Sequence, residues 1–407
     1  MDRLKMAVIG YGLRGSSVTK HILLKMPDVD IVAVCDEYAD RAEQAACDVE
    51  AAGGKRPFAS TDYMTVLNLE GLDAVYIATS WETHVEIAVD AMRKGIPVAL
   101  EVGGAYSIES LWEMVRVQEC TGTPLMLMEN CCFGKDELFA TALVRRGLLG
   151  DVVHCHGAYA HYLAEEIASG EQKRHYRLRN YLARNCENYP THELGPIARI
   201  LGINRGNRML SLVSVASRAA GMEDYIAQNA KTYPDLVGKK FRQGDIVNTI
   251  ITCTDGSTIS LRLDTTLPRS YSRELTVRGT RGLYEQNTHS VYLAGEKEYW
   301  VPEKYYRQNL GNAKRFEQEF LPPVWRDMTE EQIRAGHGGM DYIEFCVFTD
   351  ALRKHTPMPI DVYDAAAWMA VTALSEASIA AGGQVQAIPD FTCGKWTRRT
   401  NVDVVEW

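Results

Sequence analysis

The sequence predicts two domains, an α/β N-terminal domain with a doubly wound parallel sheet and a C-terminal α+β domain with a large, mostly antiparallel sheet. Three observations carry this prediction. The 407 residues exceed what one hydrophobic core usually holds. Strand and helix patterns alternate as far as about residue 130, and beyond it β-like runs follow one another. We therefore expect domains at residues 1–130 and 131–407.

The start of the chain reads as strand, glycine loop, helix, strand and acid. An apolar run, Met6–Ile9, leads into residues 10–15 (Gly-Tyr-Gly-Leu-Arg-Gly), and a helical pattern covers about 13–26. A second apolar run, Ile31–Cys35, ends at Asp36. This order is typical of the βαβ unit of a Rossmann domain that binds a dinucleotide.

Each residue type in this unit has a chemical reason. Gly10 makes the tight turn, Gly12 lets the backbone approach a pyrophosphate, and Gly15 lets the helix meet the strand. The helix N-terminus then faces the phosphates. Asp36 accepts from ribose hydroxyls and would repel a 2′-phosphate, so the expected cofactor is NAD. The cofactor-binding residues expected in this segment are Gly10, Gly12, Leu13, Arg14, Gly15 and Asp36.

Three further strands are expected at residues 73–78, 97–101 and 124–128, with helices at 85–94 and 108–119. In parallel sheets the ligand lies at the carboxyl ends of the strands. Polar candidates that fall there are Thr79, Trp81, His84, Glu101, Glu129 and Asn130. Each alone is more simply a strand-end residue or a helix cap, but their shared position favours a cofactor site.

The second domain opens with a helix at 135–149, and the β-like runs that follow are 152–159, 209–215, 246–252, 258–263 and 274–278. Residues 164–188 are polar and aperiodic, which predicts a long loop over the cleft or an ordinary surface excursion. Residues 336–341 (Gly-His-Gly-Gly-Met-Asp) predict either a flexible loop that brings His337 to a ligand or a linker into a helix at 342–354. A last helix is expected at 362–381.

Ionisable side chains concentrate in residues 185–196 (Asn-Cys-Glu-Asn-Tyr-Pro-Thr-His-Glu-Leu-Gly-Pro). If a helix begins at Thr191, His192 lies in its first turn with Tyr189 just ahead on the same side. A neutral imidazole and a phenol placed together can pass protons. The alternative is a helix start whose Tyr and His only cap and pack.

The composition limits the kinds of partner that the protein is expected to bind. The net charge is −9, from 44 basic and 53 acidic residues, and the basic residues form no long run, so nucleic acid is not expected. No apolar run could span a bilayer and the first strand begins near Met1, which predicts a cytoplasmic protein without a membrane partner. No metal is expected: His154 and His156 share a strand face but have no acidic or cysteine partner at ligand spacing.

The whole chain resembles the glucose-fructose oxidoreductase, inositol dehydrogenase and MocA family (Gfo/Idh/MocA). Ordinary dehydrogenases of that family carry Glu-Lys-Pro after the fifth strand, whereas residues 101–105 here read Glu-Val-Gly-Gly-Ala, without the lysine. Six motifs in order are similar to the glycoside hydrolase family 109 branch, which contains NAD-dependent α-N-acetylgalactosaminidases. These motifs are residues 79–84, 101–102, 128–130, 189–196, 269–273 and 337–341.

The resemblance implies a glycosidase mechanism without net redox change. NAD oxidises the sugar C3 hydroxyl, the acidified C2 proton leaves, the aglycone is eliminated, water adds, and the hydride returns. By the same resemblance, His192 transfers the C3 hydroxyl proton, Tyr189 and Tyr271 contact substrate or shuttle the C2 proton, and Glu101 matches the acid after the fifth strand.

Two residues depart from the family pattern. Phe133 stands where the family has an active-site tyrosine, and Glu193 replaces the glycine after Tyr-Pro-Thr-His. Together with His337, these two residues complete the expected substrate contacts.

Two alternatives to the glycosidase remain. One is a glycoside 3-dehydrogenase that stops after oxidation, and the other is a nucleotide-binding sensor without catalysis. Because the β-sheets of the family usually pair face to face, a homo-oligomer, dimer or tetramer, is expected, formed by the same C-terminal domain that binds the glycoside or sugar.

Overall fold

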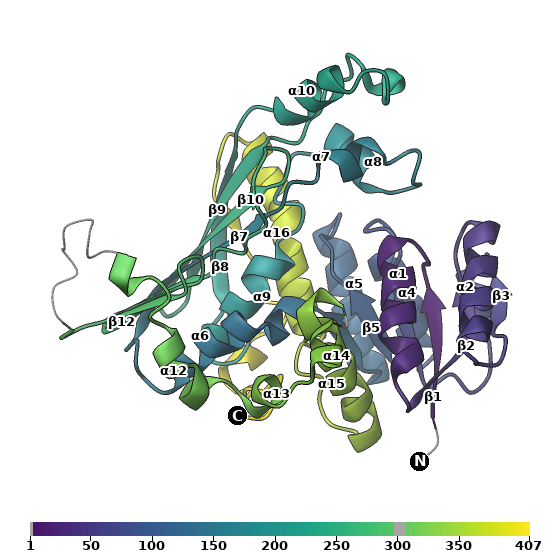
Figure 1. The fold of residues 1–407 in the computed structure, drawn as a ribbon, viewed down its shortest axis with the longest axis horizontal. Helices are drawn as coiled ribbons and strands as arrows, with labels where there is room; N and C mark the ends of the chain where they lie inside the picture. Colours follow the sequence, from purple (N-terminus) through teal and green to yellow (C-terminus); the bar gives the residue numbers. More distant parts are fainter. Residues whose placement is uncertain (1–2, 297–306, 335) are drawn as a thin grey trace. The chain divides into compact units, whose positions relative to one another are not determined.

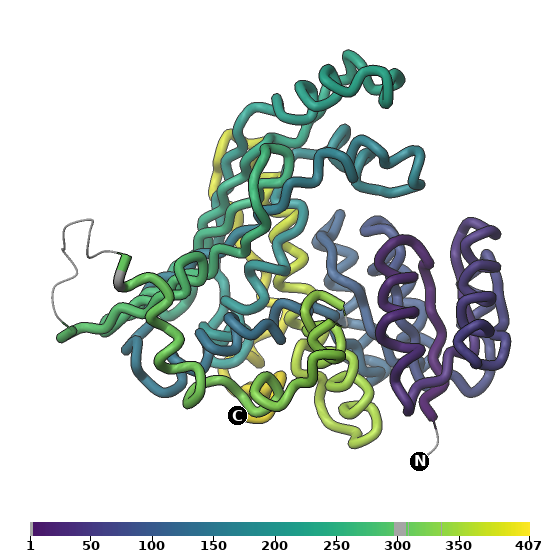
Figure 2. Tube along the Cα trace, in the orientation of Figure 1, coloured from purple at the N-terminus to yellow at the C-terminus, as the bar shows by residue number. Residues whose placement is uncertain are grey.

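The computed structural model describes residues 3–296, 307–334 and 336–407, and the chain divides into two compact units (Figure 1). Unit 1 comprises Met1–Phe133, Asp327–Ala366 and Val402–Val405. Unit 2 comprises Gly134–Arg326, Ala367–Asn401 and Glu406–Trp407. The first crossing lies close to the expected boundary at residue 130, but the chain later returns: Asp327–Ala366, expected in the second domain, belongs to unit 1 (Figure 2).

Unit 1 contains a six-stranded parallel sheet of order β3-β2-β1-β4-β5-β6. Its strands are β1 (Leu4–Ile9), β2 (Val29–Cys35), β3 (Phe58–Ser60), β4 (Ala74–Ile77), β5 (Val98–Glu101) and β6 (Leu125–Met128). Strands β4, β5 and β6 are buried on both faces, which explains their continuous apolar runs. The predicted doubly wound sheet is confirmed. Of its strands, only the short, largely exposed β3 was not predicted from the sequence.

The helices of unit 1 are α1 (Leu13–His21), α2 (Ala39–Ala51), α3 (Tyr63–Leu67), α4 (His84–Arg93), α5 (Ile108–Thr121), α14 (Glu330–Arg334) and α15 (Met340–Lys354), with short 3₁₀ turns η1 (Leu23–Lys25), η2 (Asn130–Phe133) and η5 (His337–Gly339). The helix predicted over 13–26 is shorter. It ends at His21 because Ile22 leaves the helical region, with φ −120° and ψ −72°, and the buried Leu23 opens a 3₁₀ turn before Pro27.

Unit 2 contains an eight-stranded sheet of order β13-β12-β11-β7-β10-β9-β8-β14. Its strands are β7 (Val152–Ala160), β8 (Met209–Ala216), β9 (Ile246–Cys253), β10 (Thr258–Asp264), β11 (Thr276–Gly279), β12 (Gly282–Glu285), β13 (Ser290–Leu293) and β14 (Gln386–Ala387). Only β7 and β10 pair in parallel, so the predicted mostly antiparallel sheet is confirmed.

The helices of unit 2 are α6 (Lys135–Arg145), α7 (Ala164–Ala168), α8 (Arg177–Ala183), α9 (Thr191–Ile200), α10 (Gly221–Gln228), α12 (Lys314–Phe320) and α13 (Pro323–Arg326), with 3₁₀ turns η3 (Pro234–Leu236), η4 (Arg307–Asn309) and η6 (Lys395–Thr397). Helix α16 (Val362–Ala380) begins in unit 1 and continues into unit 2. The long loop predicted over 164–188 was wrong, because α7 and α8 form there. Each is too short to show a helical period, and each is held by buried side chains such as Ile167 and Leu178.

Helix α9 lies directly on the sheet of unit 2, where a glycine allows a close approach. A Cβ at Gly157 on β7 would lie 2.8 Å from the Cβ of Glu193, so a larger residue would push the helix away. This contact fixes the start of α9, and with it the residues around Thr191, against the strand that ends at Ala160.

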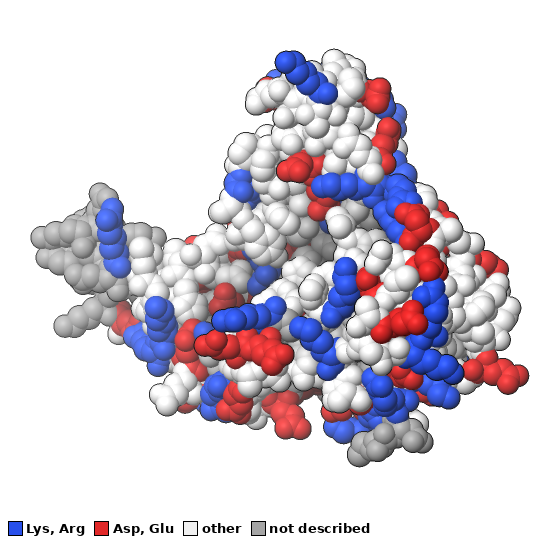
Figure 3. Space-filling model, turned by 45° about the vertical axis from the view of Figure 1, so that its right-hand side comes forward, with Lys and Arg blue, Asp and Glu red and all other residues white. Residues whose placement is uncertain are grey.

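On the face drawn in Figure 3, basic and acidic side chains are interspersed. Within the described ranges, no helix has both the length and the apolar character needed to cross a lipid bilayer.

Candidate active site

The glycine loop of unit 1 has the geometry that its sequence predicts. Gly10 has φ +96°, and a Cβ there would lie 2.5 Å from the carbonyl oxygen of Ala78. A Cβ at Gly15 would lie 2.0 Å from the carbonyl oxygen of Gly10. At Gly12 a Cβ would meet only the Arg41 guanidinium, at 3.7 Å. The first and third glycines are thus required by packing, and the second leaves room for a ligand.

The residues around this loop fit a dinucleotide. Gly12 stands at the N-cap of α1 and has no side chain to cap it, so the first N–H groups of the helix, from exposed Leu13 onward, can take phosphate oxygens. Asp36, just after β2, accepts hydrogen bonds from the backbone N–H of Tyr11 (2.7 Å) and of Tyr38 (3.0 Å). These bonds fix the carboxylate at the strand end and leave lone pairs for ribose hydroxyls.

The turn between β4 and α4 is compact. Thr83 Oγ1 donates to Thr79 Oγ1 at 2.9 Å, and His84 Nε2 lies 3.0 Å from the Thr79 carbonyl oxygen. Burial lowers the pKa of His84 to about 4, so its ring is neutral at neutral pH. Trp81 is buried in the same turn, where a Cβ at Gly103 would lie 2.4 Å from its ring. Three predicted cofactor residues therefore shape one turn at the carboxyl end of β4.

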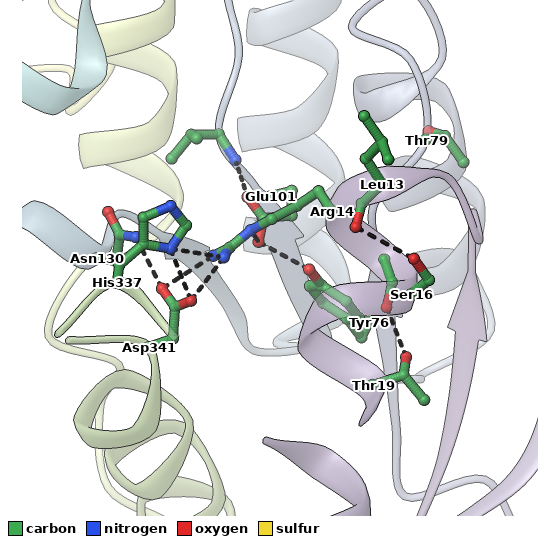
Figure 4. A network of polar contacts seen from close by, with 12 residues as sticks. Leu13, Arg14, Ser16, Thr19, Tyr76, Thr79, Glu101, Asn130, His337 and Asp341 are labelled. Carbon is green, nitrogen blue, oxygen red and sulfur yellow. Dashed lines mark hydrogen bonds and ion pairs between the residues drawn. The ribbon is translucent and has the colours of Figure 1, made fainter. Parts of the chain in front are cut away.

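Arg14 and Glu101 form an ion pair beside this turn (Figure 4). Arg14 Nε donates to Glu101 Oε1 at 2.7 Å, and the Tyr76 hydroxyl donates to the same oxygen at 2.8 Å. The other side of the guanidinium donates to Asp341 from Nη1 (2.7 Å) and Nη2 (3.2 Å). The structure thus brings two predicted cofactor residues into direct contact and adds Asp341 as a second acidic partner of Arg14.

Asp341 also lies within hydrogen-bonding distance of Asn130 and His337. Asn130 Nδ2 donates to Asp341 Oδ1 at 2.7 Å, and His337 Nδ1 lies 2.9 Å from Asp341 Oδ2 and 3.2 Å from Arg14 Nη1. His337 has φ +41° and its side chain is 56% exposed. The glycine-rich stretch thus forms a 3₁₀ turn that places His337 beside the cofactor residues of unit 1. Its predicted contact with substrate stays a prediction.

In unit 2, Tyr189 and His192 lie together at the start of α9. Their ring centroids are 4.8 Å apart and the rings are nearly perpendicular, at 88°. Helix α9 begins at Thr191, so the predicted placement of His192 in the first turn, with Tyr189 just ahead of it, is confirmed. A phenol and an imidazole in contact have the chemistry to exchange protons with a bound sugar.

Further rings extend this pair along unit 2. Tyr159, near the end of β7, lies 4.6 Å from Tyr189 and 5.6 Å from His192, centroid to centroid. His161 lies 6.0 Å from Tyr159 and 5.1 Å from Tyr271. We call Tyr159, His161, Tyr189, His192 and Tyr271 the ring cluster. It connects all the predicted catalytic residues of unit 2.

Sequence reasoning missed Tyr159, His161 and Arg177. The Arg177 guanidinium lies 5.0 Å from the Tyr189 ring centroid, and its Nε lies 2.7 Å from a carboxylate oxygen of Glu166. Burial raises the pKa of Tyr159, which keeps its hydroxyl protonated. Alternation along β7 could have indicated that residues 159 and 161 share a face, but nothing in the sequence connects Arg177 with Tyr189.

Phe133 and Glu193, the two departures from the family pattern, are both buried. Phe133 ends the turn η2 of unit 1 and is 0% exposed. Glu193 is 2% exposed, because it lies on the α9 face that packs over Gly157. Their predicted substrate contacts stay predictions.

Two family models together match nearly the whole chain. The model described as "Oxidoreductase family, NAD-binding Rossmann fold" matches residues 4–128. The model described as "Glycosyl hydrolase 109, C-terminal domain" matches residues 133–398.

Among known proteins, a "Glycosyl hydrolase family 109 protein" of Stenotrophomonas maltophilia (strain K279a) is 36% identical over 421 residues, which cover 98% of this chain and 91% of that protein. An "Alpha-N-acetylgalactosaminidase" of Tannerella forsythia is 36% identical over 412 residues, which cover 95% of this chain and 86% of that protein.

Solved structures share the fold at lower identity. A levoglucosan dehydrogenase in complex with NADH and levoglucosan aligns with a TM-score of 0.69 at 16% identity, covering 95% of this chain and 100% of that chain. A myo-inositol 2-dehydrogenase from Lactobacillus plantarum aligns with a TM-score of 0.65 at 15% identity, with coverage of 95% and 100%.

Proposed function

Since this chain belongs to glycosyl hydrolase family 109, we propose that it is an NAD-dependent glycosidase whose reaction involves no net redox change. The family matches confirm the resemblance that the six motifs predicted, and they confirm NAD as the cofactor of an enzyme. The observation that supports the proposal is the contact between the Tyr189 and His192 rings, in a chain whose glycine loop has the close approaches expected of a dinucleotide-binding loop.

The residues that would hold the cofactor are those of the glycine loop, Asp36 and the strand ends of unit 1. When bound, NAD supplies the acceptor for the C3 hydride of the sugar and the donor that returns it. Oxidation at C3 makes the C2 hydrogen acidic, so the aglycone leaves C1 by elimination, and water then adds at C1. This route explains why two flanking carboxylates, which ordinary glycosidases need, are not required.

The ring cluster would move the protons. His192 takes the C3 hydroxyl proton and later returns it, while Tyr189 and Tyr271 contact the sugar or carry the C2 proton. Tyr271 suits contact with a ligand, because it is 47% exposed and its hydroxyl accepts a 3.2 Å hydrogen bond from Arg273. By analogy with the Tannerella forsythia relative, we propose N-acetylgalactosaminides as the first substrates to test.

The experiment is a panel of nitrophenyl glycosides, led by the N-acetylgalactosaminide, in which released phenol and absorbance at 340 nm are followed together. We expect phenol release without net NADH, lost in His192→Ala and kept in His21→Ala, a histidine on the exposed end of α1. Phenol release that survives His192→Ala would contradict the assigned role, and silence across the panel would point to another sugar or to a sensor.

The second candidate is a glycoside 3-dehydrogenase. The absence of a hydroxyl at Phe133 favours it, because one group of the family site is missing there. Stoichiometric NADH without phenol in the same assay would establish this activity instead.

We also propose that the protein is a homo-oligomer. Val213 and Val215 on β8 pair with Ile250 and Asn248 on β9, so all four lie on one face of the unit 2 sheet. Val215 is 59% and Ile250 42% exposed, which supports a contact between copies through this face. A molar mass from light scattering that equals one chain would contradict a homo-oligomer.

We also propose a cytoplasmic location. It is supported by the ten cysteines, which all carry free thiols.

A further inference from the structure

Arg14 extends from the glycine loop into a group of buried acids in unit 1 (Figure 4). Its guanidinium donates to Glu101 on one side and to both oxygens of Asp341 on the other. Burial alone would lower the pKa of Arg14, but Glu101 and Asp341 raise it well above its usual value. The guanidinium is therefore a fixed positive charge, fully engaged by two carboxylates of this chain.

A third acid, Glu344, lies one turn beyond Asp341 on α15 and is 0% exposed. Burial, and then the neighbouring Glu101 and Asp341, raise its pKa well above the usual value, which favours the neutral, protonated carboxyl. Asp341 behaves in the opposite way. Burial alone would raise its pKa, but Arg14 and His337 hold it well below its usual range.

While the ring of His337 is neutral, the charges of this group do not cancel. Glu101 and Asp341 then contribute two negative charges and Arg14 one positive charge, while protonated Glu344 contributes none. Buried Glu129 adds a further carboxyl near Glu344. A partly buried surplus of negative charge is costly unless a cation comes close to it.

The sheet order indicates which part of the cofactor meets this surplus. Asp36, after β2, suits the ribose of the adenosine half, and the phosphates suit the start of α1. The other half of a bound dinucleotide would then extend over β4, β5 and β6 on the far side of β1. Glu101 ends β5 and Asn130 follows β6. These residues would lie on the side that holds the nicotinamide ring, which is a cation only in the oxidised cofactor.

We propose that Glu101, with Asp341 as a positioning residue acting through Arg14, makes this site bind oxidised NAD more tightly than NADH. The inference rests on the proposed function and deepens it. A cycle without net redox change begins and ends with oxidised cofactor, and a site that favours the oxidised form helps return the hydride to the sugar.

The test measures both dissociation constants on the full chain freed of cofactor. NADH binding is followed by its fluorescence, and NAD binding by competition against NADH. We expect the wild-type protein to bind NAD more tightly. Glu101→Gln should shift the affinity ratio about tenfold toward NADH, the effect of one unit charge acting over several ångströms in a partly buried site. Asp341→Asn should shift it in the same direction, because Arg14 then adds uncompensated positive charge.

The matched control is Glu344→Gln, which alters a carboxyl in the same group that carries no charge at neutral pH, so the ratio should stay unchanged. Circular dichroism verifies that each variant is folded. The inference is overturned if Glu101→Gln weakens both forms equally, or if Glu344→Gln shifts the ratio as much. A wild-type preference for NAD without glycoside cleavage would contradict the proposed function alone, and failure to bind either form would contradict both.

Discussion

The acid group of unit 1 and the ring cluster of unit 2 use opposite chemistry. Around Arg14 the side chains are charged, ion-paired and largely buried, whereas around Tyr189 they are aromatic rings, with His192 edge to face and Tyr159 tilted. Fixed charges set an electrostatic field but exchange no protons near neutral pH, because their pKa values lie far from it. Phenols and imidazoles can donate and accept protons. The difference supports our proposal that unit 1 binds and tunes the cofactor while unit 2 binds the sugar.

The strongest way to break this division is to remove one hydroxyl from the ring cluster. Tyr189→Phe keeps the ring beside Tyr159 and His192 but loses its proton, so kcat for glycoside cleavage should fall about 10²–10⁴-fold. NAD affinity should not change. Steady-state kinetics and NADH fluorescence measure the two quantities, with Tyr225→Phe on α10 as the control. A parallel loss of NAD affinity would contradict the division.

The next largest effect is expected at the glycine loop. Gly10→Ala places a methyl group 2.5 Å from the Ala78 carbonyl at φ +96°, so unit 1 should lose about 3 kcal/mol of unfolding free energy together with NAD binding. Gly71→Ala is the matched control: φ is +75° but no atom lies within 4 Å of the added Cβ, so only about 1 kcal/mol is expected. Urea unfolding measures both, and equal losses would refute the steric reason.

Glu187 in unit 2 has a raised pKa, in contrast to the lowered pKa of Asp341 in unit 1. Burial raises the pKa of Glu187 to about 8, above its ordinary value of 4.5. A raised folded-state pKa gives stability that is full below pH 4.5 and is lost as the pH rises through 8. Glu187→Gln should therefore nearly match the wild type at pH 5 and exceed it by roughly 5 kcal/mol above pH 8. Thermal unfolding at both pH values tests this, and a gain at pH 5 alone would contradict it.

The smallest effect is expected at Glu274, where unit 2 holds its own ion group. Hydrogen bonding to His156, then to Arg269, lowers the pKa of Glu274 to about 2, against the opposing effect of burial. Its stabilisation is therefore present above pH 4.5 and lost as the pH falls toward 2. After solvent screening, Glu274→Gln should cost about 1 kcal/mol at pH 7 and nothing near pH 2. Unfolding curves at the two pH values measure this difference in unfolding free energy, and an equal loss at both would contradict the role of the Glu274 charge.

Glu274 also shows what sequence spacing cannot reveal. His154 and His156 had no acidic partner by spacing, but the structure brings Glu274 to 3.3 Å from His156 Nε2, a contact across 118 residues. By contrast, the Tyr189 and His192 pair was predictable, since a helix start fixes neighbours three residues apart. Asp36 was also predictable, because strand, glycine loop, helix and strand follow one another along a short stretch of the chain.

The sequence by itself determined the type of both sheets and most of their strands, the glycine loop with Asp36, and the start of α9, because each depends on local periodicity, on turn chemistry or on residues close along the chain. Only the tertiary structure decided that Asp341 meets Arg14 across 327 residues, and that Tyr159, His161 and Arg177 surround the predicted pair. The physical reason is that such contacts depend on which surfaces exclude water together. No spacing along a single chain encodes that choice.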